Sequence, residues 1–361
     1  MWKKAITAIK NNDKDWIFKH LSDFPEFFKS ENVKPTGKLS AEALQAHYQE
    51  KLFKLFLSKS YNGLALPLTK GAKIIENASI LDSNWGWLLG IGVGGAYFAD
   101  YCNPTTAQKF FSPPEALVAG SGKPTSSIEK DHENWLISGE WNYCSGAEQA
   151  SLFTAVVQKE NKITAFILPT SLGKIKKDWN AIGLPFTCSH TIVAQKAPIP
   201  NSYFFDLSKD PHQNKYPISS YSFLAFAMAC FAPVINGITQ SLFFEVKKFI
   251  IYKKDIWQKH QPERYKYLVE KMDVFQEKQA ELRLQFYTTL DKSWKNHLNN
   301  KSSNENEVMS AGRALADFNY SETNKIIPQL GMLVLDKNNI IQQKYQDLQT
   351  AYQHMIFRNY I

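Results

Sequence analysis

The most restrictive feature of this sequence is the long segment Tyr216–Phe244, which contains no charged residue. Its most apolar part, Phe223–Ile235, contains Pro233 and is shorter than the ~20 residues that span a bilayer, and polar side chains interrupt the remainder. A helix that is apolar on every side is buried on every side, as at the centre of a helical bundle or an oligomer. A second apolar segment, Trp85–Ala99, is also too short to span. Both segments predict buried helices, and no membrane association is expected.

The basic charge of the chain does not predict nucleic-acid binding. The formal net charge is +8, but lysine supplies nearly all of the positive charge. Surfaces that clamp phosphates use arginine forks and clustered basic stripes. The arginines here are few and widely separated, at positions Arg264, Arg283, Arg313 and Arg358. The surplus lysines predict a well-solvated surface, and nucleic acid is excluded as a partner.

The cysteines indicate a reducing compartment. They lie far apart, without a CxxC pair or a cysteine–histidine pattern at zinc spacing: Cys102, Cys144, Cys188 and Cys230. Such cysteines predict reduced, buried thiols in a cytoplasmic protein and no metal site. The first residues, MWKKAITAIKNNDKDW, lack the continuous apolar core of a signal peptide.

Three regions differ in their residue patterns and predict three domains. These are an N-terminal helical domain over 1–112, a middle β domain over 113–212 and a C-terminal helical bundle domain over 213–361. In the first region, apolar periodicity and candidate caps predict helices over 13–23, 40–58, 69–81, 83–101 and 107–111.

The middle region is built from short runs of β-favouring residues between turn residues. These runs predict strands over 116–119, 135–138, 152–157, 163–168 and 191–197. The polar stretch Gln158–Lys162 predicts a hairpin loop. Short strands at this spacing suggest a small antiparallel barrel or sandwich.

From about Pro217 onward the pattern is helical again, in long segments. In the helix that begins near Pro262, positions recur at alternating steps of four and three, as in a coiled coil: Leu268, Met272, Phe275, Gln279, Leu282, Phe286 and Thr289. Further helices are predicted over 307–327 and 338–357. Four long helices with amphipathic seams predict a four-helix bundle.

The segment Ser138–Ala150, SGEWNYCSGAEQA, places an aromatic strand before a Ser-Gly corner. With the period of two that a strand has, Trp141, Tyr143 and Ser145 fall on one face. Strands that only fill a core seldom finish on a serine at a glycine corner. The pattern suits a strand that lays an aromatic floor beside a planar ligand.

Several short motifs, in this order and spacing, resemble those of the acyl-CoA dehydrogenase superfamily. TAQKFF at 106–111 followed by AGSGKP at 119–124 resembles the family's short helix and flavin-side loop, and WNYCSG at 141–146 resembles the strand that ends at the flavin ring. GLPFTCSH at 183–190 resembles the G-x-x-x-T-x-S stretch. YQDLQTAYQH at 345–354 resembles the terminal motif of the two-component flavin-dependent monooxygenases, a branch that uses this fold for hydroxylation.

The resemblance implies an α+β fold with an N-terminal helical domain, a small antiparallel β-barrel domain and a C-terminal four-helix bundle. It also implies a flavin-dependent oxidoreductase that takes reduced flavin, FAD or FMN, from a separate flavin reductase and hydroxylates a small organic molecule. The many apolar helix faces would be exposed in a monomer, so a homo-oligomer is expected, and the resemblance implies a tetramer.

By the same resemblance, Ser145 lies at the reactive edge of the flavin, Gly146 lets the backbone approach the ring, and Trp141 forms an apolar wall. A hydroxyl donor near N5 can hold the proton on a reduced flavin. The alternative is that Ser145 only caps a turn and that Trp141 fills the barrel core.

His354 occupies a position close to where the dehydrogenases carry their catalytic glutamate and where the monooxygenase branch has a histidine. An imidazole with a pKa near neutrality is suited to act as the base that activates a phenolic or similar substrate. The alternative for a single histidine in a helical bundle is a structural role.

Four further residues are implied to contact flavin or substrate. Ser121 matches an active-site hydroxyl, and Thr187 and Ser189 match hydroxyls that meet flavin phosphate or substrate. Lys253 stands where a neighbouring subunit usually supplies an arginine to the flavin phosphate, although lysine lacks the bidentate fork. For the three hydroxyls, turn chemistry is the alternative.

Departures from the family pattern leave two other functions open. The turn Gly92–Gly95 lacks the branch's histidine, and Pro185, Gln343 and Gln346 replace arginines. One alternative is an FAD-dependent acyl-CoA dehydrogenase with Glu322 as its base. The other is a catalytically degenerate homologue that keeps the fold as a scaffold.

His190 follows Ser189 directly and is a weak substitute for the missing base. The spacing of the remaining histidines does not indicate a metal site.

Overall fold

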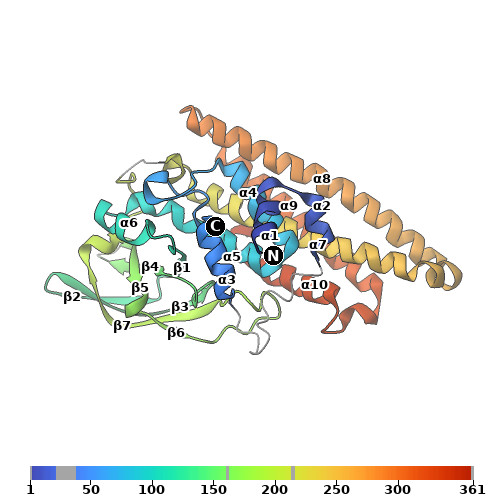
Figure 1. Cartoon of the computed structure of the whole chain (residues 1–361), viewed down its shortest axis with the longest axis horizontal. Helices are drawn as coiled ribbons and strands as arrows, with labels where there is room; N and C mark the ends of the chain where they lie inside the picture. The colour runs from blue at the N-terminus through green and yellow to red at the C-terminus, as the bar shows by residue number, and fades with distance from the viewer. Residues whose placement is uncertain (1, 22–37, 160–161, 213–215, 359–361) are drawn as a thin grey trace.

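The computed structural model describes residues 2–21, 38–159, 162–212 and 216–358. Helices from both ends of the chain pack together, and the strands form a separate region beside them (Figure 1). The predicted mixture of helix and sheet is thus confirmed. The predicted domain boundary at 212/213 adjoins residues outside the described ranges, and the boundaries stay predictions.

Six α-helices precede the strands in the described part of the chain. They are α1 (Trp2–Asn11), α2 (Lys14–Lys19), α3 (Ala41–Gln49), α4 (Leu68–Leu81), α5 (Ser83–Gly94) and α6 (Pro104–Phe111). Ser40 and Asp82 cap α3 and α5, accepting hydrogen bonds from Ala43 N–H and Trp85 N–H. α5 is buried along almost its whole length, as its uncharged sequence predicts.

The strands form two four-stranded sheets. One has the order β1-β4-β5-β8 and the other β2-β3-β7-β6. The strands are β1 (Val118–Ser121), β2 (Ser126–Asp131), β3 (Asn134–Cys144), β4 (Leu152–Lys159), β5 (Lys162–Pro169), β6 (Lys174–Lys176), β7 (His190–Pro200) and β8 (Phe204–Phe205). Strands β4 and β5 form the predicted antiparallel hairpin.

The predicted closed antiparallel barrel is not what the described strands form. β1 pairs with β4 in parallel, and no ladder among the described residues joins the two sheets. Side chains from both sheets instead share one apolar core, which includes Phe153, Phe166 and Ile192. Two sheets around a common core are the arrangement of a sandwich.

The end of β3 departs from the predicted alternation. The pairing of β3 with β7 shifts in register between Trp141 and Cys144, and Tyr143 adopts a φ of 64°. An irregularity of this kind places an extra residue in one strand and redirects the side chains that follow. Trp141 and Cys144 are buried, whereas Tyr143 is 66% exposed. The prediction that Trp141, Tyr143 and Ser145 share a face is therefore wrong.

Four helices follow the strands, and the second half of the first of them extends beside α8 to one end of the molecule (Figure 1). α7 (Phe223–His260) packs against α4, α5, α8 (Pro262–Leu298), α9 (Glu305–Ile326) and α10 (Ile340–Ala351). By length and composition, α7 alone among the described helices could cross a membrane, but 78% of its apolar window is buried inside the protein. Burial of this extent is what the core helix of a soluble protein shows.

The predicted coiled-coil seam of α8 is its buried face. Leu268, Met272, Phe275 and Phe286 are buried. The polar member of the seam, Gln279, donates from Nε2 to Asn319 Oδ1 on α9 at 2.9 Å. The alternating spacing therefore predicted correctly which side of the helix faces the bundle.

A buried carboxylate links the N-terminal helices to the long helices. Glu76 on α4 is fully buried; it accepts from Arg283 Nε at 2.9 Å, from Tyr287 Oη at 3.0 Å and from Asn236 Nδ2 at 3.0 Å. Lys14 Nζ on α2 lies 3.3 Å away. Burial alone would raise the pKa of Glu76, but Lys14 and Arg283 outweigh it and lower that pKa to about 2.

Candidate functional site

Three of the predicted site residues are joined by hydrogen bonds. Ser145 Oγ lies 2.7 Å from Ser189 Oγ, which lies 2.8 Å from Thr187 Oγ1. The indole N–H of Trp87 on α5 donates to Ser145 Oγ at 2.9 Å, and Thr187 Oγ1 donates to the carbonyl oxygen of Leu184 at 2.9 Å. All of these residues are buried. We call the row Trp87–Ser145–Ser189–Thr187 the hydroxyl chain.

The glycine after Ser145 brings the end of β3 to the loop that precedes β7. Gly146 has a φ of 77°, in the left-handed region that favours glycine. Its backbone N–H donates to the carbonyl oxygen of Thr187 at 2.7 Å. The Ser-Gly corner and the loop over 183–189 therefore form one hydrogen-bonded unit.

His354 contacts the same tryptophan. Its ring stacks on Phe231 of α7 at a centroid distance of 4.2 Å and meets the Trp87 ring edge to face at 5.8 Å. The rings of Trp87 and Phe231 are 5.3 Å apart. Ser145 and His354, which lie in different regions of the sequence, thus both contact Trp87.

The tautomer of His354 follows from its hydrogen bond. The backbone N–H of Ile356 donates to His354 Nδ1 at 3.3 Å, so the neutral ring carries its proton on Nε2. Burial lowers the pKa of His354 to about 4, which keeps the ring neutral at pH 7. In this form Nε2–H donates hydrogen bonds. To act as a base through Nε2, the ring would have to protonate Nδ1 and lose the bond to Ile356.

The loop over 183–189 is anchored to two helices. Leu184 N–H donates to Asp347 Oδ1 on α10 at 2.6 Å, and Phe186 N–H donates to Asn84 Oδ1 on α5 at 2.9 Å. Leu184 and Cys188 have φ values of 54° and 45°. A left-handed backbone at a residue other than glycine costs about 1–3 kcal/mol and persists only where its surroundings impose it. The anchors on α5 and α10 supply that constraint.

Replacing Asp347 by asparagine is expected to alter the pH dependence of stability. Burial raises the pKa of Asp347 to about 6, from 3.8. Because the unfolded state loses this proton first, the free energy of unfolding falls by about 3 kcal/mol as the pH rises from 3.8 to 6. Asparagine keeps an oxygen for Leu184 N–H and does not titrate. Urea denaturation should show that the free energy of unfolding of the variant, relative to that of the wild type, is higher at pH 7 than at pH 4. Identical pH dependence of the two proteins would contradict this expectation.

Two other predicted residues lie in strands of the β region and take no part in the hydrogen bonds of the hydroxyl chain. Trp141 is buried between the sheets, with its ring 5.8 Å from that of Phe166, and belongs to their apolar core. Ser121 ends β1 and accepts from Lys123 N–H at 3.4 Å, as in a serine turn. These are the structural alternatives that the sequence left open, and the flavin contacts of both residues stay predictions.

Lys253 lies in the second half of α7. Its Nζ is 4.9 Å from the ring centroid of Tyr252. At 1.5 Å per residue, Lys253 is about 33 Å along the helix from Phe231, which contacts His354. Within a single subunit, Lys253 is therefore not part of the site around the hydroxyl chain.

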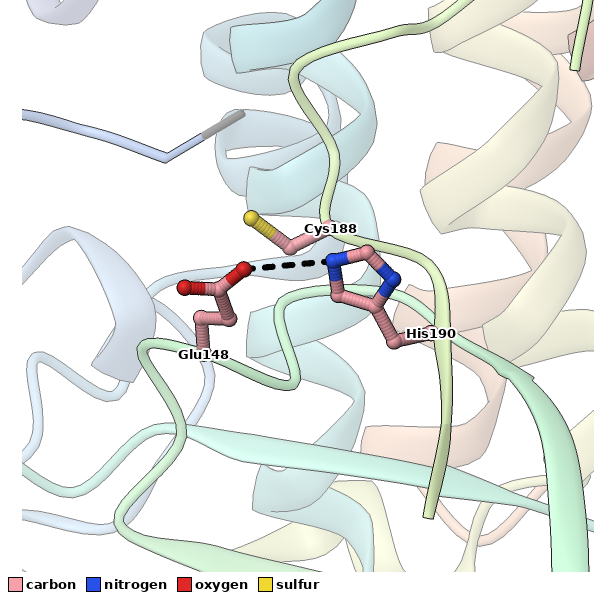
Figure 2. A group of neighbouring side chains, drawn as sticks. All are labelled: Glu148, Cys188 and His190. Carbon is pink, nitrogen blue, oxygen red and sulfur yellow. Dashed lines mark hydrogen bonds and ion pairs between the residues drawn. The ribbon is translucent and has the colours of Figure 1, made fainter. Parts of the chain in front are cut away.

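Beside the hydroxyl chain, Glu148, Cys188 and His190 approach one another (Figure 2). His190 Nδ1 accepts from Trp179 N–H at 3.0 Å, so the neutral ring carries its proton on Nε2, which lies 3.2 Å from Glu148 Oε1. A metal on Nε2 would need the proton on Nδ1, facing another N–H. Burial raises the pKa of Cys188 to about 12 and keeps the thiol protonated. The geometry is therefore that of a hydrogen-bonded pair rather than of metal ligands.

Two open hollows in the described part of the chain lie elsewhere. They have volumes of about 470 and 550 Å³, adjoin the connection between α8 and α9 and are lined by residues of 301–307 and of the two helices. Neither is lined by Ser145, Ser189 or His354. The predicted site is therefore defined by the hydrogen bonds and ring contacts of its residues and not by either of these hollows.

Trp87, Phe231 and Asp347 are site residues that the sequence did not single out. The signal for Trp87 was available, because a buried indole N–H needs an acceptor and α5 offers few polar partners. Asp347 lies inside the quoted terminal motif, but its role depends on a loop more than 160 residues earlier.

Comparisons with known proteins agree with the motifs. No protein-family model matches the chain. An indole-3-acetate monooxygenase of Pseudomonas putida is 24% identical over 213 residues, covering 58% of this chain and 54% of the relative. The oxygenase component of an FADH2-dependent resorcinol hydroxylase from Rhizobium sp. is 30% identical over 156 residues, covering 39% and 38%. The first of these alignments thus spans about half the length of the relative.

The likeness in structure extends over nearly the whole chain. The crystal structure of the HsaA monooxygenase from M. tuberculosis matches with a TM-score of 0.77 and 15% identity, covering 99% of this chain and 94% of that one. The resemblance inferred from the motifs is therefore confirmed: the chain has the acyl-CoA dehydrogenase-like fold in the form that flavin-dependent monooxygenases share.

Proposed function

We propose that the chain is the oxygenase component of a two-component, flavin-dependent monooxygenase that hydroxylates a small organic substrate. One observation carries the proposal: Ser145 and His354, taken from separate motifs, contact the same tryptophan ring. The matching relatives are monooxygenases and a hydroxylase, and one of them is FADH2-dependent.

The side chains around Trp87 fit the ring end of a flavin. Ser145 presents a hydroxyl at a glycine corner, and Trp87, Phe231 and His354 supply aromatic faces. Bound reduced flavin would supply the electrons for reaction with oxygen. This chain's residues would orient the ring through Ser145 and hold the substrate's oxygen near His354.

Replacing His354 distinguishes a role as hydrogen-bond donor from a role as base. The Nε2–H tautomer favours donation of a hydrogen bond to a substrate oxygen over removal of a proton. We expect His354→Gln, which keeps an N–H donor, to lose less than about tenfold in hydroxylation rate, and His354→Leu to lose about 100-fold or more. His132→Gln, on an exposed turn, is the control. A glutamine variant as inactive as the leucine variant would instead establish His354 as the base.

A flavin titration tests the proposed function against its alternatives. The purified protein is titrated anaerobically with oxidised and reduced FMN and FAD. Preference for reduced flavin supports the monooxygenase. Tight binding of oxidised FAD supports a dehydrogenase, for which Glu322, paired with Lys325 on α9, is the candidate base. Binding of neither flavin supports a scaffold.

The proposed assembly is a cytoplasmic homotetramer with a four-helix bundle in each subunit, served by a separate flavin reductase. Exposed apolar side chains on the second half of α7 and on α8 support self-association: Ile251, Tyr252, Ile256, Val274 and Leu284. In such an assembly Lys253 of one subunit would neutralise the flavin phosphate of another. Gel filtration with light scattering would measure the subunit number.

A further inference from the structure

With the bond from Thr187 to Leu184 in place, the hydrogen bonds of the hydroxyl chain run in one direction. The carbonyl oxygen of Leu184 can only accept a hydrogen bond. Thr187 therefore donates its single hydroxyl hydrogen to this oxygen. Ser189 must then donate to Thr187, and Ser145 must donate to Ser189. The bond from Trp87 agrees, because an indole N–H can only donate.

Both ends of this row are held in place. The Leu184 carbonyl oxygen also accepts from the Trp179 indole N–H at 2.9 Å, and the Leu184 N–H is bound by Asp347. At the other end, Trp87 lies on the buried helix α5. Neither end can exchange donor for acceptor, so the direction reverses only if Thr187 gives up its hydrogen bond to the Leu184 carbonyl oxygen.

The direction determines what Ser145 can offer a ligand. Its one hydrogen is engaged by Ser189, and one of its two lone pairs is engaged by Trp87. A lone pair remains, so while these bonds are kept Ser145 can accept a hydrogen bond from a ligand but cannot donate one. The sequence predicted a hydroxyl donor at this place; the hydrogen bonds make it an acceptor.

An acceptor at the flavin edge distinguishes the two redox states. N5 of oxidised flavin is a bare nitrogen that accepts hydrogen bonds, whereas N5 of reduced flavin carries a hydrogen and donates. We propose that Ser189 and Thr187 act as positioning residues that fix Ser145 as an acceptor and thereby select reduced over oxidised flavin. The inference rests on the proposed function and adds to it a physical source of redox selectivity.

The test compares dissociation constants of the full-length protein for oxidised and reduced FMN under anaerobic conditions. A hydrogen-bonding group that is left unsatisfied, or that faces another acceptor, corresponds to about a 10- to 100-fold difference in affinity. The wild type is expected to prefer reduced over oxidised FMN by this factor. Ser189→Ala frees the hydrogen of Ser145, so Ser145 can donate to N5 of oxidised FMN. The ratio of the two constants should fall about tenfold or more, mainly through tighter binding of oxidised FMN.

Two further variants keep the test decisive if Ser189→Ala folds poorly. Thr187→Val removes the acceptor that fixes Ser189 and should also reduce the ratio, whereas Thr187→Ser keeps the hydroxyl and should preserve it. An unchanged ratio in Ser189→Ala and Thr187→Val would overturn the inference. A wild-type protein that binds both forms equally would overturn the inference while leaving flavin binding intact, and one that binds neither would overturn the proposed function with it.

Discussion

Replacing Glu76 by glutamine is expected to lower the free energy of unfolding at pH 7 by about 3 kcal/mol, because it removes a fully buried carboxylate from two part-buried positive charges. Arg283 makes two hydrogen bonds to this carboxylate, and Lys14 adds a second charge. Tyr287 and Asn236 also lose a charged acceptor. Urea denaturation followed by tryptophan fluorescence measures the change.

The pH dependence of this effect identifies its cause. The pKa of Glu76 is about 2 in the folded state and 4.5 in the unfolded state, so the stabilisation is fully present above pH 4.5 and is lost as the pH falls through 2. The difference between wild type and variant should therefore shrink below pH 4. Glu50→Gln, which removes the part-exposed pair with Lys10, is the control and should cost less than about 1 kcal/mol. Equal losses in the two variants would show that burial of Glu76 contributes nothing.

Replacing Gly183 by alanine is expected to detach the 183–189 loop from α10. A Cβ at this position would lie 2.2 Å from the carbonyl oxygen of Gln346 and 2.5 Å from the backbone nitrogen of Asp347. Because both atoms are backbone, the overlap is relieved only by moving the loop, at a cost of about 1–3 kcal/mol or more. The Leu184–Asp347 hydrogen bond and the anchored end of the hydroxyl chain would be lost. We expect lower stability and at least a tenfold loss of reduced-flavin affinity, measured by denaturation and anaerobic titration.

The matched control for this substitution is Gly122→Ala. A Cβ at Gly122 meets nothing within 4 Å. Its effect on unfolding should stay within about 0.5 kcal/mol, the usual range for surface substitutions, and flavin affinity should not change. If Gly183→Ala behaved like Gly122→Ala, the loop would not depend on its contact with α10.

Much of the fold was predictable because it follows from burial patterns that are local in sequence. The uncharged segment of α7 and the seam of α8 both lie in the core. α1 was not predicted, although Trp2, Ala5, Ile6 and Ile9 form a buried face at helical spacing. β2 was missed for another reason: it is an edge strand of sequence SSIEKD, whose polar residues suit an edge but resemble a loop.

The candidate site was predictable only in part. Ser145 was named from one motif and Thr187 and Ser189 from another, and their hydroxyls form one hydrogen-bonded row. The orientation of Tyr143 was not predictable, because a register shift between strands depends on the partner strand and not on the alternation within one. The contribution of Trp87 depends on how α5 packs against the β region. No local sequence pattern encodes the distance between the Trp87 indole nitrogen and Ser145 Oγ.

α7 joins two environments in one continuous helix. From Phe223 to Val246 most of its side chains are buried, whereas Ile251, Tyr252 and Ile256 are exposed. The free energy needed to open a backbone hydrogen bond differs accordingly along its length. We expect amides of the first part to exchange with solvent mainly through global unfolding, and those of the second part to exchange through local fraying. The two halves of α7 are therefore expected to differ in local stability, with the second half the more easily rearranged of the two.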